Sequence, residues 1–433
     1  MELTSTEYTP STNSAYPTRA VVLVVDKYSQ DVHLASLTAG VKYPIKYGSR
    51  SGIEYTRGFY SILADLANVQ QGVSVFFYRR RIDEPTEGRG FIGEWAAAGD
   101  AYEDLSSSIV YNNLKILGIC SNCGCPVSTL EDEKIVCKYC KGELNGHILP
   151  LRFPLRTVYR YPRYLDDNTA YVDITDEGRL STLIFRKVYG AGRERSVNPI
   201  LPEEAEKLRR LLHRVEQDRQ NHQVSHPSSM PYNQSVSIQK LSDYINLKQK
   251  YKISGKGSTH LYETKSGELV YETILEFWLM LELGRNPQGL LATLGIPPHE
   301  RLEWFANQVL FGIGGEKSDV LLLMRNGSNQ RCRAIVIELK KGVVGLQSIQ
   351  QVRSYAYWIA QLATAQVQHC IQMPFKITPI MIGHRVSRGA KPFAPFSLVI
   401  PYSTPLTVEI ESPQVFTYSV DTSNNTLQLA RKI

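Results

Sequence analysis

The chain has 433 residues, which is too long for one ordinary hydrophobic core and predicts two or three domains. Hydrophobic residues make up 42% and charged residues 21% of it, and no apolar run approaches the roughly 18 residues that cross a bilayer. The first residues carry neither a basic start nor an apolar stretch, so we expect no secretion signal, no membrane partner and a cytoplasmic location. The net charge of +7, with a pI near 8.9, permits a polyanionic partner without requiring one.

After a flexible N-terminus at residues 1–18, the region 19–200 is rich in short β-like runs. AVVLVV, VSVFFY, GFIGEW and RLSTLIF are separated by Gly, Pro and Asp, which favour turns. One helix is expected at residues 59–69, ahead of VSVFFY. This pattern predicts a β-rich module with few helices.

Two CxxC pairs interrupt this module. Four of the seven cysteines form the pairs, with 13 residues between them: Cys120, Cys123, Cys137 and Cys140. That spacing is typical of four thiolates around a tetrahedral Zn²⁺ ion, so we predict a zinc ribbon at residues 118–145. A redox dithiol fits less well, because such centres carry one CxxC pair at a helix start. A site with four thiolates has no open position for a substrate, so the zinc would be structural.

Residues 201–236 are expected to form a helix followed by a linker. The run PEEAEKLRRLLHRVEQDRQ has acidic residues in its first turn and basic residues later, as the helix dipole prefers. The run NHQVSHPSSMPYNQS is polar and lacks an apolar period, which is typical of a linker. Residues 237–433 then alternate helix, strand, strand, helix and strand, which predicts an α/β domain.

Asp319 and Glu338 are expected to face each other across a β-hairpin. The runs DVLLLM and RAIVIELK flank the turn RNGSNQR, and pairing about a midpoint between Ser328 and Asn329 sets the two carboxylates opposite each other. Carboxylates about 5 Å apart repel by about 3 kcal/mol at an effective dielectric near 20, unless a cation lies between them. Mg²⁺ or Mn²⁺ suits such a site, because these ions take carboxylate oxygens and bind substrate phosphate. Lys340 leaves the same face of the strand as Glu338 and could orient or deprotonate an attacking water. The alternative is ordinary surface charge at the ends of two strands.

Over residues 265–385 the chain carries GELVYETILEFWLMLELG, SDVLLLM, VIELKKG and IQQVRSYAYWIAQ, in that order. This series resembles the PD-(D/E)xK nuclease superfamily, in particular its NucS-like, RecB-type domains. The resemblance implies a mixed sheet flanked by helices and a metal-dependent DNA endonuclease. It implies Asp319 and Glu338 as metal ligands, with Lys340 as the catalytic lysine. It also implies that Gln351 and Tyr355, the QxxxY motif, lie near the scissile phosphate. Double-strand cutters of this kind commonly need two active sites, which leaves a homodimer open.

The same family contributes one glutamate from its first helix. Three candidates stand at i, i+4 spacing on one predicted stripe: Glu268, Glu272 and Glu276. We choose Glu272, which heads the pattern ExxLE, and Glu276 is the close alternative. His384 and Arg385, at the end of the strand ITPIMIGH, are further candidates for phosphate contacts.

The runs RGFYSILADLANVQQGVSVFFYRR and GRGFIGEWAAAGDAY resemble PUA-like folds of the EVE and YTH type, over about residues 20–190. Such domains often hold a modified base in an aromatic cage, so the resemblance implies a reader of nucleic acid. Aromatic faces stack on bases and cations bind phosphates, which marks five pocket candidates: Tyr47, Arg57, Tyr78, Arg79 and Trp95. The alternative for each aromatic residue is packing in the core.

Together these patterns predict a PUA-like barrel with an inserted zinc ribbon, a linker, and an α/β nuclease domain. The expected function is a restriction or defence endonuclease whose first module reads DNA, including modified DNA. One alternative is a NucS-like repair nuclease for mismatched or branched DNA. An alternative of another class is a nucleic-acid-binding subunit with an inactive nuclease fold.

Overall fold

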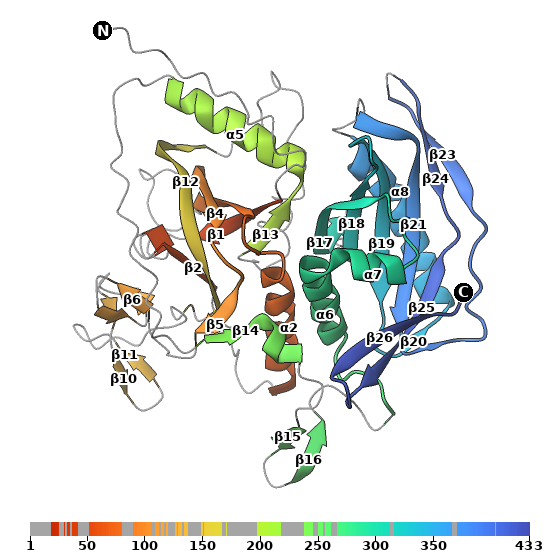
Figure 1. The fold of residues 1–433 in the computed structure, drawn as a ribbon, viewed down its shortest axis with the longest axis horizontal. Helices are drawn as coiled ribbons and strands as arrows, with labels where there is room; N and C mark the ends of the chain where they lie inside the picture. Colours follow the sequence, from red (N-terminus) through yellow and green to blue (C-terminus); the bar gives the residue numbers. More distant parts are fainter. Residues whose placement is uncertain are drawn as a thin grey trace.

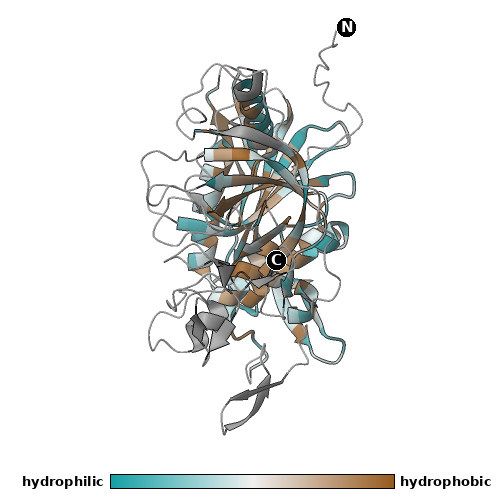
Figure 2. Ribbon diagram, turned by 90° about the vertical axis from the view of Figure 1, so that its left-hand side faces the viewer, coloured by the Kyte–Doolittle hydropathy of each residue, from teal (hydrophilic) through white to brown (hydrophobic). Residues whose placement is uncertain are grey.

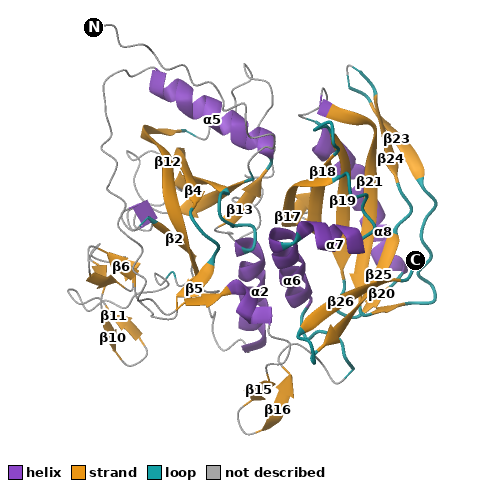
Figure 3. Cartoon of the chain, viewed as in Figure 1, coloured by secondary structure: helices purple, strands orange, loops and turns teal. Residues whose placement is uncertain are grey.

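The described part of the chain folds into two mixed β-sheets with a few helices packed on them (Figures 1 and 3). A hydrophobic core lies along the central strands and helices (Figure 2). The computed structural model describes residues 19–25, 30, 33–34, 37–41, 52–79, 90–104, 109–111, 114–116, 118–119, 126–127, 129–131, 134–136, 149, 151–166, 170, 197–217, 238–245, 250–253, 256–260, 266–311, 316–365, 370–402 and 404–433.

The N-terminal sheet has eight strands in the order β13-β1-β3-β4-β12-β5-β14, with β2 paired to β12. β1 and β3 are parallel, and the other pairings in this sheet are antiparallel. The strands are β1 (Ala20–Val25), β2 (Thr38–Val41), β3 (Ser74–Arg79), β4 (Gly90–Ala97), β5 (Tyr102–Asp104), β12 (Leu151–Leu165), β13 (Val197–Ile200) and β14 (Ile238–Lys240). A short 3₁₀ helix, η1 (Leu241–Ile245), follows β14.

Helices α2 (Gly52–Leu66) and α5 (Pro202–Gln217) cover opposite faces of this sheet. Phe77 of β3 packs in the core on the α2 side, whereas Tyr78 packs in the core on the α5 side. Because both faces of β3 are covered, its sequence SVFFYR is almost continuously apolar and does not alternate with polar residues.

Short strand pairs lie between β5 and β12 in the sequence. Since β5 and β12 are neighbours in the sheet, this insertion leaves the host sheet continuous. The pairs are β6 (Ile109–Tyr111) with β7 (Leu114–Ile116), β8 (Gly118–Ile119) with β9 (Pro126–Val127), and β10 (Thr129–Glu131) with β11 (Lys134–Val136). A separate hairpin, β15 (Lys250–Ile253) and β16 (Lys256–His260), precedes the second half of the chain.

The C-terminal sheet also has eight strands, in the order β17-β18-β19-β21-β24-β23, with β25 paired to β21 and β26. β21 is parallel to β19, β24 and β25, and the other pairings in this sheet are antiparallel. The strands are β17 (Arg301–Phe311), β18 (Glu316–Arg325), β19 (Arg331–Leu339), β21 (Ile371–Gly383), β23 (Phe396–Ile400), β24 (Leu406–Ile410), β25 (Gln414–Asp421) and β26 (Thr426–Arg431). Two short parallel strands, β20 (Val343–Val344) and β22 (Arg385–Val386), pair beside this sheet.

Helices α6 and α8 cover opposite faces of the second sheet. Ile337 of β19 packs in the core on the α6 side, and Val336 packs in the core on the α8 side. Asn286 begins α7 by accepting a hydrogen bond from the backbone of Gly289, as a helix N-cap does. The helices of this half are α6 (Glu272–Arg285), α7 (Pro287–Thr293) and α8 (Leu346–Thr364).

The two halves meet along α2 and α6, which lie side by side at the centre of the molecule (Figure 1). Their side chains share one hydrophobic core, in which the rings of Tyr60 and Phe277 have centroids 6.0 Å apart. At Gly284 of α6 an added Cβ would lie 1.6 Å from Nε2 of Gln70 and 3.1 Å from the carbonyl oxygen of Ala67. A larger residue at this position would displace the Gln70 side chain and press on the backbone that follows α2.

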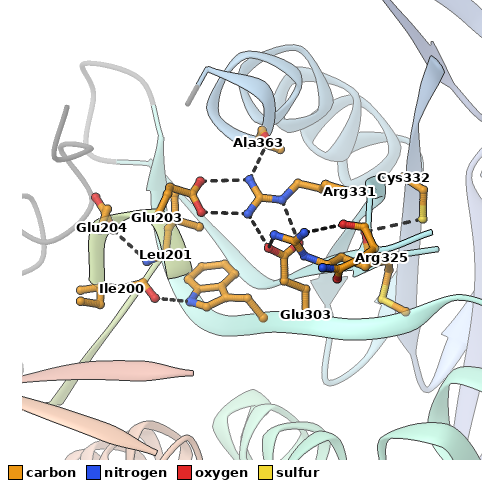
Figure 4. Close-up of polar contacts among 12 residues, drawn as sticks. Ile200, Leu201, Glu203, Glu204, Glu303, Arg325, Arg331, Cys332 and Ala363 are labelled. Atoms are coloured by element: carbon orange, nitrogen blue, oxygen red, sulfur yellow. Dashed lines mark hydrogen bonds and ion pairs between the residues drawn. The ribbon is translucent and has the colours of Figure 1, made fainter. Parts of the chain in front are cut away.

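A buried ion-pair network also joins the halves (Figure 4). Arg331 of β19 is 0% exposed, donates at 3.0 and 2.9 Å to the two carboxylate oxygens of Glu203 on α5, and binds Glu303 of β17. Arg325 binds Glu303 at 2.7 Å as well. Burial alone would raise the pKa of Glu303, but the attraction of the two guanidinium groups outweighs it and the pKa is lowered.

The predicted β-rich character, the small number of helices and the multidomain organisation are confirmed. The expected helix at 202–220 is found as α5, and the run IQQVRSYAYWIAQ lies on α8, while the helix expected at 59–69 begins earlier, at Gly52. Residues 238–240, which the sequence assigns to the C-terminal part, instead complete the first sheet as β14, because they pair with β5. The strand β17 and the strands after β22 were not predicted. None of the helices in the described ranges is both long and apolar enough to cross a membrane.

Candidate active site

The hairpin of β18 and β19 has the register that the sequence predicts. Val320 pairs with Ile337, and the same register continues to the pair of Met324 with Arg333. One step before the first of these pairs, this register sets Asp319 opposite Glu338. The backbone N–H of Leu339 donates to Oδ2 of Asp319 at 2.7 Å, which ties the first carboxylate to the strand that carries the second.

Lys340 lies against Glu338. Its ammonium nitrogen is 2.5 Å from Oε1 of Glu338, whose side chain is 2% exposed. The other oxygen, Oε2, is buried and has no hydrogen-bond partner among the described residues. An ionised carboxylate oxygen that is buried without a donor is costly, so this atom favours a cation or a donor from a bound ligand.

The electrostatics of the cluster follow from its burial and its crowded negative charge. Burial raises the pKa of Asp319 well above its usual value, and the carboxylates of Glu338, Glu272 and Glu276 raise it further. The pKa of Glu338 is also raised, chiefly by burial, although Lys340 opposes this shift. Burial alone would lower the pKa of Lys340, but attraction to Glu338 and the other carboxylates raises it. Lys340 therefore keeps its proton at neutral pH and is poorly suited to accept one from water.

The structure separates the three glutamates that the sequence left open. Helix α6 begins at Glu272, so Glu268 precedes the helix, and the expectation of one helical stripe through all three residues is wrong for Glu268. Glu272 accepts a hydrogen bond from the backbone of Lys341 at 3.2 Å and acts electrostatically on Asp319. Glu276 is 3% exposed, and both of its oxygens accept side-chain amide donors.

Helix α8 brings Gln351 and Tyr355 to the same end of the sheet. Nε2 of Gln351 is hydrogen-bonded to the hydroxyl of Tyr355, whose side chain is 1% exposed and packs on the α8 side of the sheet. Burial raises the pKa of Tyr355, and the charges of Glu338 and Asp319 raise it further. The tyrosine therefore stays protonated near this acidic pair.

Tyr418 of β25 fastens the segment that follows Lys340. Its hydroxyl donates to the carbonyl oxygen of Lys341 and accepts the backbone N–H of Leu269 at 2.9 Å. The ring of His384 lies 5.4 Å from the ring of Tyr418, and Arg385 is exposed on β22. The sequence reasoning missed Tyr418, because no motif marks it.

Carboxylate oxygens, the donors at this hairpin, are the ligands that hard divalent cations prefer. The described residues contain no group of three carboxylate, histidine or cysteine side chains close enough in this arrangement to hold a metal ion. The Lys340 ammonium is instead the cation on Glu338, and two amides occupy Glu276. A divalent cation would nevertheless supply a partner for the buried oxygen of Glu338 and would favour the ionised form of Asp319, whose pKa is raised.

The pocket candidates of the N-terminal half have mixed outcomes. Tyr78 and Trp95 are each 1% exposed, and they pack on Phe91 and Phe77 with ring centroids 5.2 and 4.7 Å apart. Neither offers an open aromatic face, because α2 and α5 cover both faces of the sheet that carries them. Arg79 donates to the hydroxyl of Tyr164 at 2.6 Å and lies over its ring. Tyr47 and the side chain of Arg57 lie outside the described residues.

The four cysteines of the predicted zinc ribbon, Cys120, Cys123, Cys137 and Cys140, lie outside the described residues as well. The strands around them are described. β8 and β9 pair on either side of the first CxxC, and β10 and β11 form a hairpin between the two pairs.

Two polar residues that the sequence reasoning missed lie beside the acidic cluster. Asn307 and Gln308 interrupt the apolar run of β17, and Asn307 is 0% exposed. A polar dipeptide inside an apolar strand is the signal that could have identified them, because buried amides need partners.

No family model matches the chain, and no curated protein matches it. Among solved structures, a hypothetical protein from Leishmania major matches over 47% of this chain and 98% of its own, with 16% identity and a TM-score of 0.26. A protein from Pseudomonas putida matches over 44% of this chain and 98% of its own, with 16% identity and a TM-score of 0.25. Human THYN1, solved in complex with 5-methylcytosine-containing DNA, matches over 47% of this chain and 100% of its own, with 13% identity and a TM-score of 0.25. TM-scores of this size assign the chain to no family.

Proposed function

We propose that the protein is a metal-dependent DNA endonuclease of the PD-(D/E)xK type. The observation that supports it most is the opposition of Asp319 and Glu338 across one hairpin, with Lys340 against Glu338 and a buried Glu338 oxygen without a partner among the described residues. A structural role does not explain such a cluster, because two like charges beside apolar strands destabilise the fold.

In this proposal Asp319 and Glu338 would hold a Mg²⁺ or Mn²⁺ ion, and Glu272 would be the glutamate that the first helix contributes to the site. When bound, that ion supplies Lewis-acid polarisation of a phosphodiester oxygen and favours the ionised form of both strand carboxylates. Glu272 is preferred over Glu276 because the oxygens of Glu276 are already occupied by Asn307 and Gln308.

The remaining residues act on the substrate. Lys340, which keeps its proton on Nζ, orients the attacking water and balances the negative charge that develops on the phosphate. Its raised pKa favours this role over proton abstraction. Tyr355 retains its hydroxyl proton, and Gln351 restrains that hydroxyl beside the acidic pair. Water and phosphate are thus held in fixed geometry at the end of the hairpin.

The N-terminal half would select the DNA. We propose that it is a PUA-like module, related to the EVE and YTH types, with a structural zinc ribbon at residues 118–145. A module that reads modified bases joined to a nuclease suits restriction or defence. Since Tyr78 and Trp95 are buried, a base-binding pocket in this half would have to use other residues.

Cleavage assays on defined DNA test the proposal. Plain, methylated and hydroxymethylated duplexes are incubated with the full chain and Mg²⁺, beside the Lys340→Ala variant and the control Lys432→Ala, which removes an exposed lysine after β26. We expect Mg²⁺-dependent cleavage that falls about 100-fold or more in Lys340→Ala and is unchanged in the control. The nuclease assignment is lost if no substrate is cut, and the modified-base assignment is lost if all substrates are cut equally.

A further inference from the structure

A run of hydrogen bonds leads from helix α2 in the N-terminal half to Asp319. Asn307 of β17 donates from Nδ2 to Oδ1 of Asp65 on α2, at 2.9 Å, and to Oε1 of Glu276 on α6, at 2.7 Å. Gln308 donates from Nε2 to Oε2 of Glu276, at 3.1 Å, and to Oδ1 of Asp319, at 3.4 Å. Two neutral amides therefore connect three carboxylates from three different elements.

Three members of the array are removed from water, and Gln308 and Asp319 are half-buried. Asn307 is 0%, Glu276 is 3% and Asp65 is 5% exposed. In such a low-dielectric environment hydrogen bonds are stronger and a lost donor is costly, so the positions of these groups depend on one another.

Gln308 has a backbone conformation that glutamine rarely adopts. Its φ is +52°, in the left-handed region that favours glycine. Trp304 and Ala306 before it and Val309 after it all pack in the core on the α8 side, so the alternation of β17 is interrupted at this residue. Strained residues persist where their surroundings over-determine them, and they cluster at functional sites.

The strand register places this strained residue next to the acidic pair. Asn307 pairs with Val320 and Val309 pairs with Ser318, which sets Gln308 across from Asp319. Asp319 lies in turn across from Glu338 in the register of the next strand pair. Three neighbouring strands thus present an amide and two carboxylates in one row.

We propose that Asn307 and Gln308 are positioning residues of the acidic site, and that Asp65 makes the N-terminal half a part of it. The consequence for catalysis rests on the proposed nuclease function. By occupying both oxygens of Glu276, the amides hold this carboxylate as a fixed neighbour of Asp319. Metal binding is left to Asp319 and Glu338, with Glu272 beside them. Because Asp65 accepts from the same nitrogen of Asn307, the orientation of that amide depends on helix α2.

Three substitutions separate this role from a general structural one. Gln308→Glu keeps the shape of the side chain but replaces the donor with an acceptor. Gln308→Gly accepts the left-handed backbone and removes the amide. Asp65→Asn keeps an acceptor for Asn307 but removes the charge that orders its donor. Gln428→Glu, at an exposed position on β26, is the matched control.

Binding of Mn²⁺ to the full chain, followed by electron paramagnetic resonance, is the first measurement, and the pH profile of single-turnover cleavage is the second. We expect Mn²⁺ affinity to fall about tenfold in Gln308→Gly and less in Asp65→Asn. Urea unfolding shows whether Gln308→Gly, which relieves the left-handed backbone but removes the donor to Oε2 of Glu276, still folds. In Gln308→Glu the acidic limb of the pH profile should move to higher pH, because an added carboxylate disfavours ionisation of Asp319.

Unchanged Mn²⁺ affinity in Gln308→Gly and Asp65→Asn would overturn the positioning role, even if the wild type cuts DNA. A wild-type chain that binds no Mn²⁺ would overturn it as well. If the variants lose Mn²⁺ affinity as expected but no DNA is cleaved, the positioning role stands and only the nuclease function fails.

Discussion

Replacing Asp319 by asparagine should stabilise the metal-free protein while abolishing its metal-dependent activity. In the hairpin register Asp319 lies opposite Glu338. Burial and the charge of Glu338 raise the pKa of Asp319, and burial chiefly raises the pKa of Glu338. Asparagine removes one of the two charges. Its carbonyl oxygen can still accept the N–H of Leu339, which donates to Asp319 in the wild type.

The magnitude follows from the geometry of facing strands. Side chains in this relation have Cβ atoms about 5 Å apart, and two charges at that distance repel by about 3 kcal/mol at an effective dielectric near 20. Lys340, whose pKa is raised by these carboxylates, already offsets part of the repulsion. We therefore expect Asp319→Asn to increase the free energy of unfolding by about 1–2 kcal/mol in the absence of divalent ions.

The sign of the pH dependence follows from the raised pKa of Asp319. An unfolded aspartate loses its proton near pH 4, whereas the native residue retains it to higher pH. Within that window the native state binds more protons than the unfolded state, so wild-type stability falls as the pH rises. The advantage of the variant should therefore grow as the pH rises above about 4.

Urea unfolding in EDTA at several pH values measures this difference, with Glu409→Gln as the control. Glu409 is on β24 of the same sheet, where it faces Ser397 and not a carboxylate. Adding Mg²⁺ at about ten times its dissociation constant should stabilise the wild type by about 1.4 kcal/mol and leave Asp319→Asn unchanged. A variant that is less stable than the wild type at pH 8, or a difference that does not grow with pH, would refute the repulsion argument.

Three further predictions concern the supports of the site. Glu203→Ala should lower the free energy of unfolding by about 2–4 kcal/mol, because the buried Arg331 loses two charge-assisted hydrogen bonds. Glu206→Ala, on the same helix, should lower it by less than about 1 kcal/mol. Equal effects of the two substitutions in urea unfolding would contradict this. Tyr418→Phe should cost about 1 kcal/mol and slow single-turnover cleavage, because its hydroxyl joins Lys341 to Leu269, and an unchanged cleavage rate would show that this link is dispensable. A zinc-specific dye should detect about one zinc per chain after thiol modification, and none in a Cys120→Ser/Cys137→Ser variant.

Local patterns made the hairpin predictable from sequence. Two apolar runs of similar length around a polar turn leave one symmetric register, and that register fixes which residues face each other. The pairing of Val320 with Ile337 has the predicted midpoint between Ser328 and Asn329. Helix α5 was equally predictable, since its acidic first turn and later basic residues indicate where a helix begins and ends.

Long-range packing could not be predicted from the sequence in the same way. Tyr78 and Trp95 carry a pattern that suits an exposed pocket as well as a core, and only the positions of α2 and α5 on the two faces of the sheet bury them. The start of α6 at Glu272 separated Glu268 from the helix, and the amides of Asn307 and Gln308 distinguished Glu276 from Glu272.

The sequence by itself therefore determined the facing carboxylates, the lysine beside them and the spacing of the cysteines, because each depends on residues close together in the chain. Only the tertiary structure decided that Asp65, 254 residues from Asp319 in the sequence, belongs to the same hydrogen-bonded array. Such a contact arises from the packing of α2 against α6, which depends on the shapes of two whole surfaces and leaves no periodic trace in either segment.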